Sequence, residues 1–225
     1  MTQERPYLTS TDWGLALKWE GMELIADFGA LRQRTSPGRL GSELLVKAAK
    51  HDKLFRGKEL TALDATAGLG EDSFLLAAAG FRVSMYERDP MIFALLEDAL
   101  RRAGSDPDTA PIASRMTAVP GDSIEYMKKL AEGISDAEGP PDIIYLDPMF
   151  PARKKSGLIK KKFQILQQLE APETDGEALI KAAIDASPRR IIVKRPAKAP
   201  VLGGVRADYS IKGDVIRYDC IILRP

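Results

Sequence analysis

The strongest constraint in this sequence is a regular alternation, from residue 60 onward, of short apolar segments with segments whose apolar residues recur at helical spacing. The apolar segments predict strands at 60–64, 82–87, 116–119, 143–146 and 190–193. The segments between them predict helices at 72–79, 91–103, 123–132, 163–170 and 175–186. Such alternation forces right-handed crossovers, and therefore a mostly parallel sheet that helices cover on both faces. The sequence thus predicts an α/β domain over residues 43–225, ending in an antiparallel strand pair at 209–212 and 215–223.

Residues 1–42 do not follow this alternation and predict a small β-rich appendage. Residues 14–28 alternate loosely around Glu20-Gly21, which indicates a hairpin, with a strand and a short helix as the alternative. Residues 29–42 are polar and rich in arginine and glycine, which indicates a loop. Ser42 is a candidate N-cap for a helix over 43–51.

Composition excludes several classes of function. The chain has 225 residues and a net charge of +1, so its average charge predicts no polyanion partner. A single histidine, His51, and a single cysteine, Cys220, allow neither a disulfide within the chain nor a zinc site of the usual kind, so we expect no metal. No apolar run approaches the ~20 residues of a membrane span, and the first residues lack a signal-peptide core. We expect a soluble, cytoplasmic protein without a membrane partner.

Ligands of parallel sheets bind beyond the carboxyl ends of the strands, so the residues that follow each strand are informative. The first strand is followed by Asp64–Asp72, DATAGLGED, in which Gly68 and Gly70 let a ligand approach the backbone closely. The dinucleotide fingerprint would need a third glycine where this chain has Ser73, and Asp64 would repel a pyrophosphate. An acid here suits a cation, such as the sulfonium of S-adenosyl-L-methionine. A tight turn that binds nothing is the alternative.

The second and third strands also end beside acidic residues. Glu87 lies 23 residues after Asp64, a spacing at which an acid can hydrogen-bond both hydroxyls of a ribose. A solvated glutamate is the alternative. Asp122, after the third strand, could accept from the exocyclic amine of adenine, could cap the next helix, or could do both.

The fourth strand is followed by Asp147-Pro-Met-Phe-Pro151, in which each proline restricts the backbone of the residue before it. A carboxylate, a rigid carbonyl and an aromatic ring are thereby presented together. This set suits a planar base that carries an exocyclic amine. Asp147 and the carbonyl of Pro148 can accept from the two amine hydrogens while Phe150 stacks on the ring. We predict these three as the catalytic residues; a rigid loop with a buried phenylalanine is the alternative.

Basic residues gather in two segments that flank strand ends. Residues 151–162 and 189–198 together carry a charge of +11 and contain no acid. Contact with phosphates is the natural use of such segments, although a run of lysines can also be a solvated face. The predicted RNA contacts are Arg153, Lys154, Lys155, Lys160, Lys161, Lys162, Lys194 and Arg195.

Four of these motifs together resemble the ribosomal RNA small subunit methyltransferase J family: DATAGLG at 64–70, ER at 87–88, DPMFP at 147–151 and VKRP at 193–196. The resemblance covers about residues 25–223. It implies a class I, Rossmann-like methyltransferase that uses S-adenosylmethionine and methylates N2 of a guanosine in small-subunit ribosomal RNA. It implies cofactor contacts at Glu71, Asp72, Glu87, Arg88, Asp122, Ser123 and Asp147, to which the strand-end pattern adds Asp64, Gly68 and Gly70.

The expected partner is small-subunit ribosomal RNA, either free or within the 30S subunit. Two alternatives remain at this point. The same fold could methylate another amine, such as a DNA adenine or a protein glutamine. A non-catalytic RNA-binding or assembly protein could also retain the cofactor pocket. A nicotinamide oxidoreductase is disfavoured by Ser73 and by the lack of a histidine suited to hydride transfer.

Overall fold

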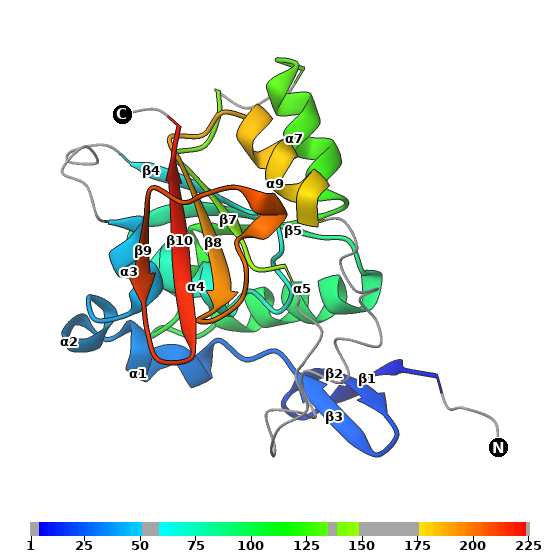
Figure 1. The fold of residues 1–225 in the computed structure, drawn as a ribbon. Coiled ribbons are helices and arrows are strands. Elements are labelled where there is room, and N and C mark those ends of the chain that lie inside the picture. The colour runs from blue at the N-terminus through cyan, green and yellow to red at the C-terminus, as the bar shows by residue number, and fades with distance from the viewer. Residues whose placement is uncertain (1–4, 51–58, 135–138, 149–175, 224–225) are drawn as a thin grey trace.

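A computed structural model of the protein describes residues 5–50, 59–134, 139–148 and 176–223, and is built around a seven-stranded sheet (Figure 1). The strands are β4 (Leu60–Asp64), β5 (Phe81–Glu87), β6 (Met116–Pro120), β7 (Ile143–Leu146), β8 (Arg190–Pro196), β9 (Tyr209–Lys212) and β10 (Ile216–Ile222). Strands β4 to β8 pair in parallel, whereas β10 pairs antiparallel with β8 and β9. The predicted α/β class and terminal antiparallel pair are confirmed.

The strand order is β6-β5-β4-β7-β8-β10-β9, so β4 lies between β5 and β7. The chain runs outward from β4 to β6 and then returns to β7 on the other side of β4. Such a reversal opens a crevice at the carboxyl ends of the strands on either side of it. The register places Asp64, the last residue of β4, opposite Met85 and Tyr145 of its two neighbours. The segments that follow β4, β5 and β7 therefore lie at one edge of the sheet.

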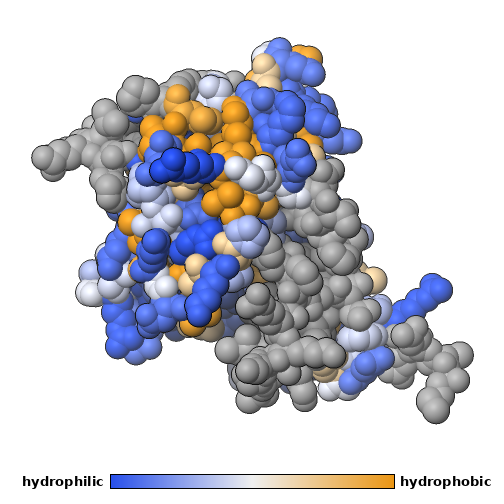
Figure 2. Space-filling model, viewed as in Figure 1, coloured by the Kyte–Doolittle hydropathy of each residue, from blue (hydrophilic) through white to orange (hydrophobic). Residues whose placement is uncertain are grey.

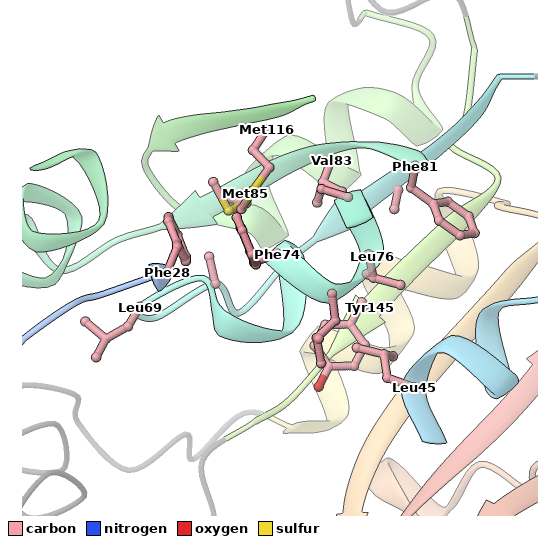
Figure 3. Close-up of a cluster of buried hydrophobic side chains, with 14 of the residues drawn as sticks. Phe28, Leu45, Leu69, Phe74, Leu76, Phe81, Val83, Met85, Met116 and Tyr145 are labelled. Carbon is pink, nitrogen blue, oxygen red and sulfur yellow. The ribbon is translucent and has the colours of Figure 1, made fainter. Parts of the chain in front are cut away.

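Helices cover both faces of this sheet. One face packs against α3 (Leu44–Ala49), α4 (Glu71–Ala78) and α5 (Pro90–Gly104), and the other against α7 (Ser123–Ala131) and α9 (Gly176–Asp185). Figure 1 shows α7 and α9 side by side, and Figure 3 shows the cluster on the opposite face, where Leu45 lies beside Tyr145 and Phe74 lies beside Met85. Short helices occur at η1 (Gly29–Leu31), α1 (Arg32–Thr35), α2 (Pro37–Leu40), α6 (Ala110–Ala113) and η3 (Leu202–Gly204).

The surface follows from this layering. In Figure 2 hydrophobic side chains gather beside α7 and α9, near the upper ends of β8 and β10, whereas α7 itself and the region around α1 and α2 are mostly hydrophilic. None of the helices in the described part of the chain combines the length and the apolar character needed to cross a lipid bilayer.

The N-terminal part forms a separate three-stranded antiparallel sheet of β1 (Tyr7–Thr11), β2 (Gly14–Trp19) and β3 (Met22–Ile25). The hairpin predicted around Glu20-Gly21 is confirmed as β2–β3, and β1 was not predicted because its sequence is mostly polar. The sheet is attached to α5, because the amide of Leu15 donates to Asp98 Oδ2 at 2.9 Å and Arg102 donates to the carbonyl of Ala26.

Two expectations for residues 29–50 are wrong. The segment 29–42 is not a loop, because it forms η1, α1 and α2, each about one turn long, with Pro37 as the first residue of α2. Phe28, just before them, stacks on Phe74 with ring centroids 4.9 Å apart. Ser42 does not cap α3, since its hydroxyl donates to the carbonyl of Arg39 at 2.6 Å. The division of the chain at residue 42 stays a prediction.

Gly68 and Gly70, the two glycines after β4, are expected to differ in how far a substitution by alanine destabilises the protein. Gly70 has φ +75°, and a Cβ there would lie 2.7 Å from Leu96 Cδ1 and 3.1 Å from Phe28 Cζ. Gly68 has φ +53° and nothing within 4 Å of such a Cβ. Gly70→Ala should therefore lower the free energy of unfolding by the roughly 1–3 kcal/mol typical of overpacking, added to a left-handed backbone cost of about 1 kcal/mol. Gly68→Ala, the matched control, should show only the backbone cost in urea denaturation. Equal losses for the two variants would contradict this difference.

Candidate active site

Asp64 shapes the loop that follows β4. Its carboxylate is 1% exposed; Oδ1 accepts from the amide of Thr66 at 3.0 Å and Oδ2 accepts from the hydroxyl of Ser73 at 2.6 Å. Burial raises the pKa of Asp64 to about 7, although these two donors favour the ionised form. Ser73, which stands where a dinucleotide fingerprint would have glycine, thus holds α4 to the end of β4. Direct contact between Asp64 and a cofactor stays a prediction.

Glu87 joins the end of β5 to the loop at 65–70 that follows β4, which contains Gly68 and Gly70 and is called the glycine loop below. Its Oε2 accepts from the amide of Gly68 at 2.9 Å and its Oε1 from the amide of Asp89 at 2.8 Å. Burial raises the pKa of this carboxylate, which is 6% exposed, and the amide donors oppose the shift. The structure therefore brings together two predicted cofactor residues, Glu87 and Gly68. A carboxylate has further acceptor sites, so these bonds leave capacity for ribose hydroxyls.

The segment after β6 packs against the same loop. The amide of Gly121 donates to the carbonyl of Glu87 at 3.0 Å, and the hydroxyl of Ser123 donates to the carbonyl of Ala65 at 2.7 Å. Asp122 caps α7, because its side chain accepts from the amide of Ile124 at 2.8 Å. The capping role is confirmed, and contact between Asp122 and adenine stays a prediction. The exposed side chain of Arg88 follows Glu87 at this edge of the sheet.

Asp147, at the end of β7, has contacts with both the glycine loop and β8. Its amide donates to Thr66 Oγ1 at 2.7 Å, and its Oδ2 accepts from Lys194 Nζ at 2.8 Å. Lys194 Nζ also donates to Asp72 Oδ2 at 2.7 Å. The hydroxyl of Tyr145 donates to the same oxygen at 2.6 Å. Two predicted cofactor residues, Asp72 and Asp147, are thus bridged by one ammonium group.

The charges of this cluster are strongly coupled. Burial lowers the pKa of Lys194, but Asp72 and Asp147 more than offset this and raise it well above its usual range. Burial raises the pKa of Asp147, while the charge of Lys194 acts in the opposite direction. Burial, with the nearby carboxylates, also raises the pKa of Tyr145 and of Tyr218. At neutral pH the lysine is therefore protonated and both tyrosines are neutral.

Of the basic residues that the sequence groups at 189–198, Lys198 is exposed, but Arg190 and Arg195 are buried. Arg195 is 2% exposed and donates to the carbonyl of Pro200 through Nε at 3.0 Å and Nη2 at 2.6 Å. Arg190, also buried, donates to the carbonyl of Ala48 at 2.6 Å, at the other end of β8. Because β8 is a central strand, its basic side chains are taken up inside the fold. Lys194 and Arg195 therefore bond within the fold, and the phosphate contacts predicted for them stay predictions.

Sequence reasoning missed several residues of this site. Thr66 lies within the recognised glycine motif, but its hydroxyl bond to Asp147 depends on the pairing of β4 with β7. Tyr145 and Tyr218 look like ordinary core residues in the sequence. Pro148 is buried at the start of the predicted turn. Phe150 and the basic residues at 153–162 lie outside the described residues, so the roles predicted for them stay predictions.

Comparison with known proteins identifies the family. A family model described as "Putative SAM-dependent methyltransferase" matches residues 2–222. The ribosomal RNA small subunit methyltransferase J of Pseudomonas aeruginosa (strain UCBPP-PA14) is 44% identical over 191 residues, covering 85% of this chain and 70% of that protein. Its namesake in Pseudomonas syringae pv. tomato is 40% identical over 218 residues, covering 94% of this chain and 78% of that protein. The chain belongs to the ribosomal RNA small subunit methyltransferase J family.

A solved structure supports the fold. The crystal structure of a SAM-dependent methyltransferase from Neisseria gonorrhoeae superposes with a TM-score of 0.76, at 31% identity, covering 99% of this chain and 86% of that one. The predicted class I methyltransferase fold is confirmed, and the cofactor of the family is S-adenosylmethionine.

The described residues fit this cofactor. Gly68 leaves open space on the side where a Cβ would stand, and its amide donates to the carboxylate of Glu87. The cluster of Asp72, Asp147 and Lys194 carries a net charge of −1 when all three are ionised. S-adenosylmethionine carries a sulfonium, an ammonium and a carboxylate, and hence a net charge of +1. The charge of the site therefore complements that of the cofactor.

Asp64 should make the stability of the protein depend on pH. Its pKa of about 7 in the folded state exceeds the ordinary value of 3.8, so the native state binds the extra proton in this range. The contribution of Asp64 to stability is full below about pH 4 and declines as pH rises to 7. The free energy of unfolding of the wild type should therefore fall relative to Asp64→Asn across this window, by on the order of 1–4 kcal/mol.

Urea denaturation at closely spaced pH values measures this difference. Asp12→Asn, at an exposed position, is the control and should run parallel to the wild type. A wild-type minus Asp64→Asn difference that stays constant between pH 4 and 7 would contradict the assignment.

Proposed function

We propose that this protein transfers the methyl group of S-adenosylmethionine to the exocyclic N2 of a guanosine in small-subunit ribosomal RNA. The observation that carries the proposal is the position of Asp147. Its amide is bonded to the glycine loop through Thr66, and its carboxylate is bonded across the site to Lys194. The carboxylate of Asp147, which can accept from an amine, thus lies next to the glycine loop. The name shared by the relatives at 40–44% identity supports the choice of ribosomal RNA.

S-adenosylmethionine, when bound, supplies a methyl group made electrophilic by its sulfonium. The residues of the chain supply orientation. The N2 amine of guanine is a poor nucleophile, because its lone pair is delocalised into the ring. Asp147 and the carbonyl of Pro148 accept from its two hydrogens, which favours a more tetrahedral nitrogen and directs the lone pair at the methyl group. The methylated nitrogen then loses a proton, so no strong base is needed before transfer.

The remaining parts of the proposal concern the substrate. Phe150 stacks on the base, and the basic residues between 151 and 162 hold phosphates. On the cofactor, Glu87 binds the ribose hydroxyls, Asp72 binds the ammonium group, and the segment from Gly121 to Ser123 borders the adenine. The substrate is the ribosomal RNA itself or the assembled 30S subunit, and the reaction takes place in the cytoplasm.

Methyl transfer from labelled cofactor tests this function. Purified small-subunit RNA, 30S subunits, duplex DNA and a glutamine-containing protein should be offered in parallel, and the labelled nucleoside should be identified by chromatography after digestion. We expect N2-methylguanosine in the RNA or in the 30S subunits alone. Label in DNA or protein would favour another amine as the target. RNA binding without transfer at saturating cofactor would indicate a non-catalytic assembly protein.

Asp147→Ala should reduce turnover by well over tenfold, because it removes an acceptor that orients the amine. Asp185→Ala is the matched control, since Asp185 also accepts from a lysine, Lys181, at 2.6 Å, but on the exposed surface of α9. Steady-state kinetics on the RNA substrate measures the effect. Unchanged turnover in Asp147→Ala would remove this residue from catalysis.

A further inference from the structure

Lys194 connects two segments that the sequence keeps far apart. Asp72 is the second residue of α4, directly after the glycine loop, and Asp147 follows β7. Lys194 Nζ lies 2.7 Å from Asp72 Oδ2 and 2.8 Å from Asp147 Oδ2. One ammonium group therefore joins the side of the site predicted to hold the cofactor to the side predicted to hold the target amine.

The register of the sheet places Lys194 at this position. β8 is parallel to β7, with Val193 opposite Leu146, so the next residues along, Lys194 and Asp147, are neighbours on the same face. On the other side Lys194 pairs with Tyr218 of β10. This is the face that α4 covers, which brings Asp72 above the pair. The side chain of Lys194 is 25% exposed and that of Asp72 16%, whereas the side chain of Asp147 is 37% exposed, so the bridge is open to water mainly at Asp147.

Lys194 offsets the repulsion between the carboxylates of Asp72 and Asp147. Asp72 and Asp147 repel each other, and Lys194 is the cation that the structure bonds to both of them. Among the described residues, the titratable groups that interact with this trio include Tyr145 on β7, Tyr218 on β10, Arg34 on α1, Arg195 on β8 and Asp64 on β4. Arg34 is itself paired with Glu43, at 2.8 Å, and Arg195 with the carbonyl of Pro200. Without Lys194, the carboxylate of Asp147 would therefore take up a proton at a higher pH.

We propose that Lys194 is a positioning residue for methyl transfer, which holds the carboxylate of Asp147 in place to receive the target amine and ties it to Asp72 on the cofactor side. The role toward the amine rests on the proposed function. The tie to the cofactor side rests only on the membership of the methyltransferase family and on the bridge itself. Both bonds of Lys194 Nζ are directed at carboxylates, which is why the lysine acts through them rather than on RNA phosphates.

Three variants separate this role from a merely structural one: Lys194→Met, Lys194→Arg and the control Lys181→Met, which breaks the exposed Lys181–Asp185 pair. For each variant, kcat and KM on the RNA, and the affinity for S-adenosylmethionine by calorimetry, are measured between pH 5 and 9. In Lys194→Met we expect kcat to fall on the order of 10²-fold, with the KM for RNA nearly unchanged. The acidic limbs of the two pH profiles, of kcat and of cofactor affinity, should move to higher pH by about one unit, because the charge that lowers the pKa of Asp147 is lost.

Lys194→Arg should recover a substantial part of both effects, since it keeps the charge. Profiles for Lys194→Met that coincide with those of Lys181→Met would overturn the proposal, even if Lys194→Met unfolded at a lower temperature. A raised KM for RNA with unchanged kcat would also overturn it, by making Lys194 a phosphate contact. If the wild type transfers no methyl group to RNA, the proposed function fails. The cofactor-affinity profile then still decides whether Lys194 controls the two carboxylates.

Discussion

The ends of parallel strands leave backbone amides and carbonyls beyond the sheet without ladder partners, and here side chains supply those partners. Glu87 accepts from the amide of Gly68, Thr66 Oγ1 accepts from the amide of Asp147, and Ser123 donates to the carbonyl of Ala65. Each of these bonds joins the loop after β4 to a different neighbouring strand or helix. The loop is thereby fixed to three neighbours at once, which is the rigidity that a transfer reaction requires of its binding surfaces.

The need to hold this loop rigid also explains why several acidic residues lie close together at this edge of the sheet. Asp64 and Glu87 are used mainly to hold backbone, and burial raises the pKa of each. Asp72 and Asp147 remain beside the lysine that bridges them. An acidic edge of this kind is a poor site for a pyrophosphate and a good one for a sulfonium cofactor. The charge pattern and the family membership therefore lead independently to the same cofactor.

The sequence predicts the framework well because β4 and β7 are short apolar runs, the first ending in Asp64 and the second followed by Asp147. The sequence does not predict the register of the sheet, so it does not show that Lys194 contacts Asp147 and Asp72. For the same reason the basic residues of β8 are predicted to lie on the surface. Arg195 is predicted to be exposed but is buried, because the charge of a residue in a sequence does not show whether its side chain is buried. The loop predicted at 29–42 is wrong because helices of a single turn have too few residues to show periodicity in the sequence.

Methyl transfer by this site depends on the target amine being presented to the methyl group at the end of β7. The most direct measurement is mass spectrometry of small-subunit ribosomal RNA from cells that lack the gene, complemented with the wild type or with Asp147→Ala. We expect one N2-methylguanosine to disappear in the deletion strain, to return with the wild type and not to return with Asp147→Ala. An unchanged set of RNA modifications in the deletion strain would contradict it.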